Sequence, residues 1–260
     1  MKWWHPADLG FAVRGKLAAL GLAARLLLRL LALVGPGLRR FGLVRDQIHF
    51  LGNHSLAIIA VSGLFVGFVL GLQGYYTLQR YGSAEALGLL VALSLVRELG
   101  PVVTALLFAG RAGTSLTAEI GLMKSGEQLS AMEMMAVDPV QRVLAPRFLA
   151  GVIVMPLLAA VFSAVGIIGG YLVGVVLIGI DPGSFWSQMQ GGVDVWRDVG
   201  NGVLKSFVFG VTVTFVALLQ GFLAHPTAEG VARATTRTVV LASLAVLALD
   251  FVLTTLMFSI

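Results

Sequence analysis

Four charged side chains lie inside stretches of the sequence that are otherwise apolar enough to cross a membrane. They are Arg97, Glu98, Lys205 and Asp250. A charge at the centre of a bilayer costs about 2.5–3.5 kcal/mol on insertion scales, so such residues pair with one another or face a polar cavity. Two interpretations follow. The charges neutralise one another and hold helices together, or some of them line a polar pocket for an anionic headgroup or a coupled ion.

The four charges differ in their surroundings. Arg97 and Glu98 are adjacent, and Pro101 follows them. Because proline has no N–H, we expect the carbonyl of Arg97 to lose its donor within the helix. Asp250 lies near the middle of its apolar stretch and should need a partner at that depth. Lys205 lies near one end of its stretch, so its long side chain could extend to the nearer membrane surface.

The stretches that carry these charges indicate an all-α membrane protein. The chain has 260 residues, of which 58% are hydrophobic and 12% charged, and its mean hydropathy is +0.93. A soluble domain has about 25% charged residues. A spanning helix needs about 20 apolar residues, and five stretches meet this requirement. They are 55–79, 86–110, 148–180, 200–224 and 238–260. The third is too long for an upright span, so it should tilt, bend or project.

The region 1–54 is basic and differs from the five-span core expected over 55–260. Its apolar run carries Arg25 and Arg29 four residues apart, and Arg14 lies within about 60° of both on a helical wheel. One cationic stripe on an apolar helix is typical of a helix that lies in the headgroup layer. We therefore expect an interfacial amphipathic helix here, with a sixth span as the alternative, and a single domain over 1–260.

The distribution of Lys and Arg predicts the orientation. The region up to Arg45 has eight of these residues and the connection 111–147 has four, whereas each other connection has one or two. Basic residues favour the cytoplasmic side, so we expect the N-terminus inside and, after five crossings, the C-terminus outside. The net charge of +5 then reflects membrane topology, and we expect no nucleic-acid partner.

Two apolar stretches carry a glycine at every fourth position. These glycines are Gly63, Gly67 and Gly71 in the first stretch and Gly166, Gly170 and Gly174 in the third. Glycine at this spacing clears one face of a helix, so that another backbone can approach closely. We expect close helix packing through these faces, with contact across a homodimer as one possibility.

The connection 111–147 contains a short helix on the expected cytoplasmic side. Ser125 and Gln128 have the spacing of a capping box, which predicts the start of a helix, and Asp138 before Pro139 predicts its end. Methionine suits adaptable binding surfaces, so a docking helix for another protein fits better than a helix that rests on the membrane. The methionines and acids that carry this interpretation are Met132, Met134, Met135, Glu127 and Glu133.

No source of energy is visible in the chain. The sequence contains no phosphate loop of the G-x-x-x-x-G-K-[ST] type and no His and carboxylate set with metal-ligand spacing. It also has no nucleophile–base constellation, so we expect neither an enzyme nor a cofactor in this chain. An alternative is an ion-coupled secondary transporter with Glu98 and Asp250 as proton or sodium sites, but the internal repeats common in that class are missing. A membrane scaffold would leave Arg97, Glu98 and Pro101 without a purpose beyond packing.

Three segments carry a resemblance to a known family. They are VALSLVRELGPVVTALLFAGRAGTSLTAEIGLMKSGEQLSAMEMMAVDPVQRVLAPRF at 91–148, GLQGYYTLQRYG at 71–82, and RATTRTVVLASLAVLALDFVLT at 233–254. Over about residues 45–260 the sequence closely resembles the MlaE family of ABC-transporter permeases. The run through R-E-L-G-P and E-M-M-A-V-D-P is highly specific to that family.

The resemblance implies a homodimeric permease in the inner membrane of a bacterium with two membranes. Its partners would be cytoplasmic ATPase subunits that bind ATP and Mg, a STAS-domain subunit and a periplasmic ring of MCE-domain subunits. The complex would move phospholipids and maintain outer-membrane lipid asymmetry. The resemblance also implies that 127–136 is the coupling helix that docks on the ATPase. That helix would present Glu127, Gln128, Leu129, Met132, Glu133, Met135 and Ala136. The outward-opening lipid cavity between the protomers would be lined by Leu70, Leu78, Tyr81, Arg97 and Glu98.

Overall fold

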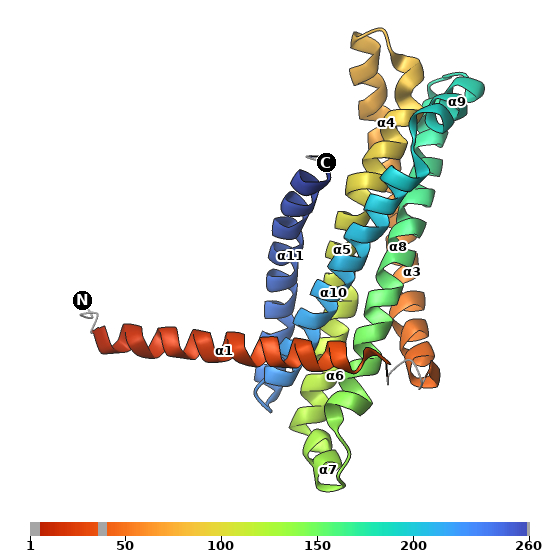
Figure 1. Cartoon of the computed structure of the whole chain (residues 1–260). Helices are drawn as coiled ribbons and strands as arrows, with labels where there is room; N and C mark the ends of the chain where they lie inside the picture. The colour runs from red at the N-terminus through yellow and green to blue at the C-terminus, as the bar shows by residue number, and fades with distance from the viewer. Residues whose placement is uncertain (1–5, 36–40, 259–260) are drawn as a thin grey trace.

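The computed structural model describes residues 6–35 and 41–258, and the chain forms a bundle of long helices with one helix lying across it (Figure 1). The crossing helix is α1 (Pro6–Ala32). At one end of the bundle the short helix α7 (Gln128–Met134) projects, and at the other end lies α9 (Pro182–Gly192). The prediction of an all-α chain is confirmed for the described residues.

Within the described residues, five helical rods are long and apolar enough to span a membrane, as the sequence predicted. They cover Phe41–Arg80, Ala84–Ser125, Val140–Leu177, Val195–Leu223 and Ala228–Met257. Each rod is longer than its apolar stretch, because helical backbone continues past the point where charged residues begin. The first rod, α3 (Phe41–Arg80), therefore starts well before Ser55, and the expected division between 54 and 55 falls inside a continuous helix.

Several rods are built from α-helical segments joined by π-helical turns. The second begins with a 3-10 helix, η1 (Ala84–Ala86), and continues with α4 (Leu87–Leu93), the π turn η2 (Ser94–Leu99), α5 (Gly100–Phe108), the π turn η3 (Ala109–Gly113) and α6 (Thr114–Ser125). The third consists of η4 (Val140–Leu144), α8 (Ala145–Tyr171) and η5 (Leu172–Leu177). The fourth consists of η6 (Val195–Val199) and α10 (Gly200–Leu223), and the fifth is α11 (Ala228–Phe258). Such π turns are rare and occur frequently at functional sites.

The π turn η2 ends two residues before Pro101, which lies in the first turn of α5. The N–H of Gly100 donates to the carbonyl of Leu95, five residues earlier, and the hydroxyl of Ser163 donates to the same carbonyl at 3.2 Å. Widening the helix by one residue before the proline lets the rod pass through Pro101 without a break. That the carbonyl of Arg97 loses its donor stays a prediction, and the structure adds a widened turn directly before the proline.

The two glycine ladders meet each other inside one protomer. A Cβ on Gly63 would stand 2.7 Å from the carbonyl oxygen of Phe162, and one on Gly71 would stand 3.1 Å from that of Gly170. A Cβ on Gly67 would collide with the carbonyl of Gly166. The backbones of α3 and α8 therefore touch at Gly67 with Gly166 and at Gly71 with Gly170, whereas Gly174 faces Leu87 of α4, and these faces are already covered without a second copy of the chain.

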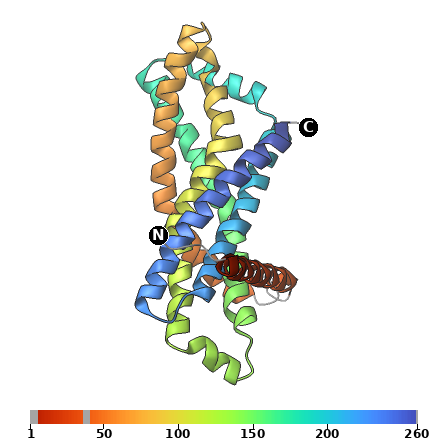
Figure 2. The same ribbon diagram turned by 90° about the vertical axis from the view of Figure 1, so that its left-hand side faces the viewer.

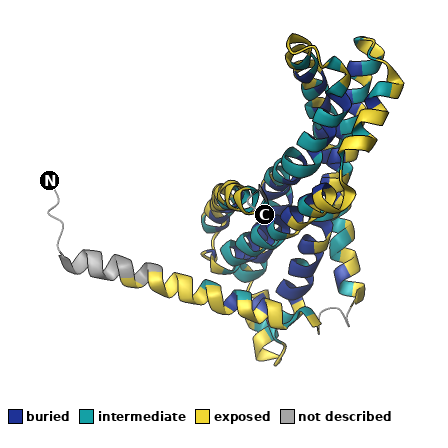
Figure 3. Cartoon of the chain, turned by 45° about the horizontal axis from the view of Figure 1, so that its top comes forward, coloured by how far each residue is buried: buried dark blue, intermediate teal, exposed yellow. Residues whose placement is uncertain are grey.

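The C-terminal half of α1 packs against the bundle through a small hydrophobic cluster. Its buried residues Leu26 and Leu30 pack in a cluster with Ile120, Leu129 and Phe148. The remainder of the described α1 surface is largely exposed (Figure 3), and Figure 2 shows the helix nearly end-on beside the bundle. The cluster thus fixes how α1 is rotated about its own axis.

Candidate functional site

Three of the four predicted intramembrane charges meet in one cluster. The ammonium of Lys205 donates to Oε2 of Glu98 at 2.6 Å and to the hydroxyl of Thr254 at 2.7 Å, and it lies 3.2 Å from Oδ1 of Asp250. The hydroxyl of Thr254 also lies 3.2 Å from Oε2 of Glu98. The second, fourth and fifth rods are therefore joined through a single ammonium group.

Lys205 is the buried centre of this cluster. Its side chain is 1% exposed, compared with 35% for Glu98 and 23% for Asp250. The expectation that Lys205 could extend to the membrane surface is wrong, because the carboxylates hold its ammonium inside the bundle. Since these groups touch, Lys205 and Asp250 lie at one depth, although their positions within their own apolar stretches differ.

Arg97 pairs elsewhere, with a residue that the sequence did not single out. Its Nε lies 3.0 Å from Oδ1 of Asp198, whose side chain is 6% exposed. Oδ2 of Asp198 accepts from the backbone N–H of Asp194 at 2.9 Å, and Oδ1 of Asp194 accepts from the N–H groups of Trp196 and Arg197. A chain of hydrogen bonds thus runs from the segment before α10 to Arg97.

Small residues allow the helices that carry the charges to approach each other. A Cβ on Gly202 would collide with the carbonyl of Val96, so the backbones of α10 and η2 touch beside Arg97. Gly202 lies between Asp198 and Lys205 on the same rod, and this contact places both of their side chains against η2.

The charges of these side chains do not leave a spare cation for an anionic headgroup. Glu98, Asp198 and Asp250 are three acids, Arg97 and Lys205 are two bases, and both bases are engaged in ion pairs. Glu98 is the most exposed carboxylate of the set, at 35%. The cluster therefore offers acceptors rather than a free positive charge, which disfavours the anionic-headgroup interpretation for this site.

Two residues of the site were missed, although helical spacing contained a signal for each. Asp198 lies seven residues before Lys205 on one continuous helical rod, and Thr254 lies four residues after Asp250. Residues at these spacings share a face of a helix. Asp198 was assigned to a connection because the apolar stretch began at 200, whereas the helix begins at Val195.

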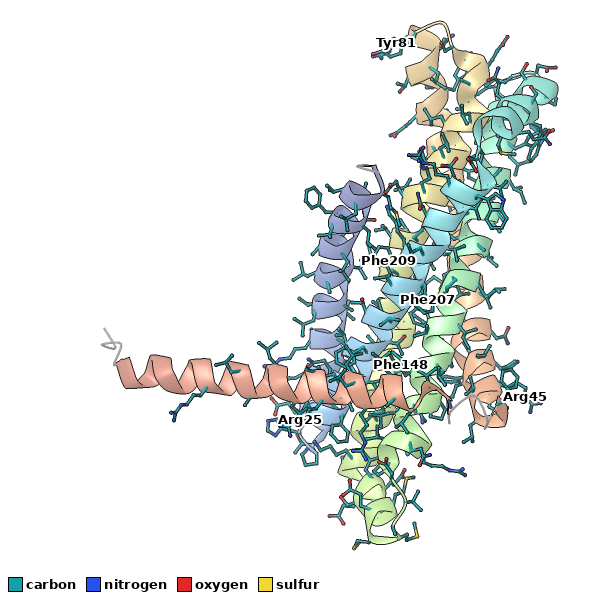
Figure 4. All side chains as sticks on the ribbon, viewed as in Figure 1. Arg25, Arg45, Tyr81, Phe148, Phe207 and Phe209 are labelled. Atoms are coloured by element: carbon teal, nitrogen blue, oxygen red, sulfur yellow. The ribbon has the colours of Figure 1, made fainter. Side chains whose placement is uncertain are left out.

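A single protomer does not gather the five positions that the resemblance assigned to a lipid cavity. Leu70 and Leu78 are half-buried against the core, and Tyr81 is 79% exposed at the end of α3 farthest from α7 (Figure 4). A cavity of about 240 Å³ in the bundle is lined by other residues, among them Val96, Pro101, Pro156, Ser163, Gly202 and Ser206. A shared cavity would need surfaces from a second protomer.

The expected cytoplasmic helix is shorter than predicted and is capped in another way. It spans Gln128–Met134, and Glu127 precedes it with a left-handed φ of 56° and no side-chain cap. The hydroxyl of Ser125 donates to the carbonyl of Leu122, so the predicted capping box does not form. Ala136 also has a positive φ, 57°. Glu127 and Ala136 flank α7, and both have backbone in the left-handed region, which non-glycine residues rarely adopt. The chain therefore turns sharply just before and just after this helix.

The two sides of α7 differ. Leu129 is buried and Met132 packs against the cluster at the base of the bundle, so this side holds α7 in place. The opposite side presents Met134 at 84% and Met135 at 68% exposure, beside the exposed acids Glu127 and Glu133. Gln128 and Ala136 are exposed as well.

Polar contacts join α1 to the segment after α7, and α6, which leads into α7, to α8 and α10. Arg29 of α1 pairs with Asp138 at 2.9 Å, and Arg147 of α8 pairs with Glu119 of α6 at 3.1 Å. The ammonium of Lys124, on α6, donates to the carbonyl of Phe222 near the C-terminal end of α10 at 2.8 Å. The segment after α7 is therefore linked to α1 directly, and α7 is linked to α8 and α10 only through α6.

Comparison with known proteins confirms the family resemblance. The model of a family described as Permease MlaE matches residues 44–256. A Haemophilus influenzae protein named "Intermembrane phospholipid transport system permease protein MlaE" is 59% identical over 252 residues, 96% of each chain. A Rickettsia typhi "Probable ABC transporter permease protein" is 36% identical over 218 residues, 84% of each chain. The chloroplastic protein TRIGALACTOSYLDIACYLGLYCEROL 1 of Arabidopsis thaliana is 29% identical over 82% of this chain and 61% of its own length.

Proposed function

The chain belongs to the MlaE permease family, and we propose that it is the membrane-spanning subunit of an ATP-driven system that moves phospholipids between two membranes. The observation that carries the proposal is the 59% identity, over 96% of both chains, to a permease named for intermembrane phospholipid transport. Five spanning rods with a polar cluster inside them support it, because an amphiphile needs both apolar walls and polar groups.

The energy for transport would come from ATPase subunits that dock on α7 and hold ATP and Mg. Met134 and Met135 are exposed at the end of α7, which projects from the bundle, and the exposed acids Glu127 and Glu133 add negative charge to the same surface. The ion pair of Arg29 with Asp138 would then transmit a displacement of the docked ATPase to α1, and the polar contacts of α6 would transmit it to α8 and α10.

The docking surface is tested by adding charge to it. Met134→Asp combined with Met135→Asp should reduce the amount of ATPase that co-purifies with the chain at least about tenfold. The docked ATPase would cover both side chains, so the double variant would bury two charges in the interface in place of two apolar contacts. Both residues are exposed in the chain by itself, so its own stability should change by less than about 0.5 kcal/mol.

The matched control is Gln188→Asp. Gln188 is exposed on α9, at the end of the bundle remote from α7. Undiminished ATPase retention and ATP-dependent lipid transfer in the double variant would contradict docking at α7. A wild-type chain that transfers phospholipid without any ATPase would contradict the proposed function itself.

Further subunits would complete the system, as the family implies. A second copy of the chain would close a lipid cavity to which Leu70, Leu78, Tyr81, Arg97 and Glu98 contribute. A STAS-domain subunit would accompany the ATPase inside. A periplasmic ring of MCE-domain subunits would sit over the projecting end that carries Tyr81 and α9 (Figure 4). The complex would lie in the inner membrane and serve outer-membrane lipid asymmetry.

The rotation of α1 supports its placement in the headgroup layer on the cytoplasmic side. Leu26 and Leu30 face the bundle, and Arg29 reaches Asp138 beside α7. At about 100° per residue, an exposed leucine face lies on roughly the opposite side from the buried one, and the arginines occupy a third face. The leucine face consists of Leu17, Leu20, Leu28 and Leu31, and the basic face of Arg14, Arg25 and Arg29.

Single cysteines test this placement, because the natural chain has none. In membrane vesicles with the cytoplasmic face outward, a charged maleimide should label Arg14→Cys at least about tenfold faster than Leu20→Cys, since the leucine face would be immersed in lipid. Leu20 is 66% exposed in the chain by itself, so protein packing does not shield it. Equal labelling in vesicles would contradict the interfacial placement.

The ion-coupled alternative loses its main support. A transported proton or sodium ion would have to bind between Glu98 and Asp250, and the ammonium of Lys205 occupies that position, 2.6 Å and 3.2 Å from their oxygens. The N-terminus inside and the C-terminus outside remain part of the present proposal, as the distribution of basic residues suggests.

A further inference from the structure

A groove lies between α10 and α11 in the half of the bundle remote from α7. Its volume is about 430 Å³, and it is lined by Arg197, Asn201, Leu204, Leu253, Leu256 and Met257. The C-terminal end of α11 and the segment that leads from α9 into α10 lie in this half of the bundle, short of the end formed by α9 and the turn between α3 and α4 (Figure 2). None of the positions assigned above to a lipid cavity lines this groove.

Arg197 gives the groove a positive charge that no other described residue neutralises. Its guanidinium is exposed and has no ion-pair partner among residues 6–35 and 41–258. The two nearest carboxylates in sequence are engaged: Asp194 accepts from backbone N–H groups, and Asp198 pairs with Arg97. Arg197 therefore differs from both bases of the ion cluster, which are already paired.

The rest of the groove is apolar and open to the side. Leu204 is 51% and Leu256 is 54% exposed, and Leu253 and Met257 are half-buried beside them. Asn201, one turn from Arg197, adds a neutral polar group at the same end. A cation and an amide at one end of an apolar groove match the headgroup and acyl chain of an amphiphile.

We propose that this groove binds one phospholipid from the surrounding bilayer, with its phosphate on Arg197 and an acyl chain against Leu204, Leu253 and Leu256. Guanidinium groups bind phosphate through two parallel hydrogen bonds. With the orientation proposed above, the groove opens to the outer leaflet of the inner membrane. This site rests on the proposed function and names a lateral binding place for the same substrate class.

The position of the groove gives it a role in exchange between the bilayer and the permease. Leu204 precedes Lys205 and Leu253 precedes Thr254, so the groove adjoins the ion cluster on both helices. Arg197 is followed by Asp198, which holds Arg97. A phospholipid in the groove would thus lie beside the polar groups that face the proposed cavity.

The site is tested with a phospholipid that carries a photoreactive diazirine in an acyl chain. The full chain, with the subunits that co-purify with it, is placed in lipid nanodiscs and irradiated, and cross-linked peptides are mapped. We expect labelling to concentrate at 253–257 of α11. Leu204→Trp fills the groove and should reduce this labelling about tenfold, and Leu256→Trp provides a second test if that variant does not fold.

The matched control for the groove is Leu244→Trp, because Leu244 is 61% exposed on α11 and does not line the groove. Arg197→Ala should lower labelling by the photoreactive phospholipid about tenfold, since a charge-assisted hydrogen bond is lost. It should leave labelling by a photoreactive diacylglycerol, which has no phosphate, unchanged. Arg80→Ala removes another exposed cation and should change neither.

Two results would overturn the site. One is labelling spread evenly along the exposed face of α11, as bulk lipid would give, and the other is labelling at 253–257 that survives both tryptophan variants. Transfer of phospholipid by the wild-type complex without labelling of the groove would remove this site and leave the proposed function. Labelling of the groove without any ATP-dependent transfer would remove the proposed function and leave the site.

Discussion

Replacing Lys205 by methionine is expected to destabilise the folded chain by about 3–5 kcal/mol, because removing one partner of a buried ion pair leaves uncompensated charges. Lys205 is 1% exposed and is the only base within ion-pair distance of Glu98 and Asp250 among the described residues. Without it, two carboxylates would remain between helices with no opposite charge. Unfolding of the purified chain in detergent, followed by circular dichroism, measures the change.

A neutral version of the same cluster separates packing from function. Lys205→Met combined with Glu98→Gln and Asp250→Asn removes all three charges together, and we expect it to recover most of the lost stability. Replacing a complete buried ion pair is often nearly neutral, in contrast to breaking it. We expect lipid transfer by the triple variant to stay at least about tenfold below wild type, because the exposed negative charge at Glu98 is gone.

The outcome decides between the two interpretations of the charges. Full transfer activity in a stable triple variant would show that the charges only hold the helices together. A triple variant as unstable as Lys205→Met would contradict the ion-pair account, since no unpaired charge would remain. Lys124→Met is the control, because that lysine is half-buried and donates to a backbone carbonyl rather than to a carboxylate.

Gly67→Ala is expected to cost about 3 kcal/mol, although it adds only one methyl group. The new Cβ would collide with the carbonyl of Gly166, which belongs to the backbone of α8. A backbone atom cannot rotate away as a side chain can, so α3 and α8 would have to separate. Expression level and the midpoint of unfolding in detergent measure the effect.

The separation would reach the site as well. A Cβ on Gly166 would itself stand 2.8 Å from Leu95, the residue whose carbonyl anchors η2, so α8 supports the turn that carries Arg97 and Glu98. Gly200→Ala is the control, because a Cβ there meets no atom within 4 Å. Equal stability of the two alanine variants would contradict close backbone contact through the ladders.

Features that depend on local composition could be predicted from the sequence. The five spans follow from runs of apolar residues, and the close-packing faces follow from glycine at every fourth position. The family follows from specific motifs such as R-E-L-G-P. The ends of the helices were less predictable, because helical backbone continues into polar sequence, as in α3 from Phe41.

The candidate site itself could be predicted only in part. The presence of Arg97, Glu98, Lys205 and Asp250 inside apolar stretches was visible, but their partners were not. Asp198 was hidden because hydropathy placed it in a connection, and the depth of Lys205 was misjudged from its distance to the end of its stretch. The capping box at Ser125 failed because the backbone at Glu127 turns into the left-handed region instead.

By itself, the sequence determined how many helices could cross a membrane, which faces could pack closely and which charges had to be compensated. These properties depend on residue type and spacing along one helix, and a single helix already contains them. Only the tertiary structure decided that the two glycine ladders face each other, that one ammonium serves Glu98 and Asp250, and that Arg97 is held by Asp198. These are contacts between helices, and they depend on how each rod is rotated and shifted against its neighbours.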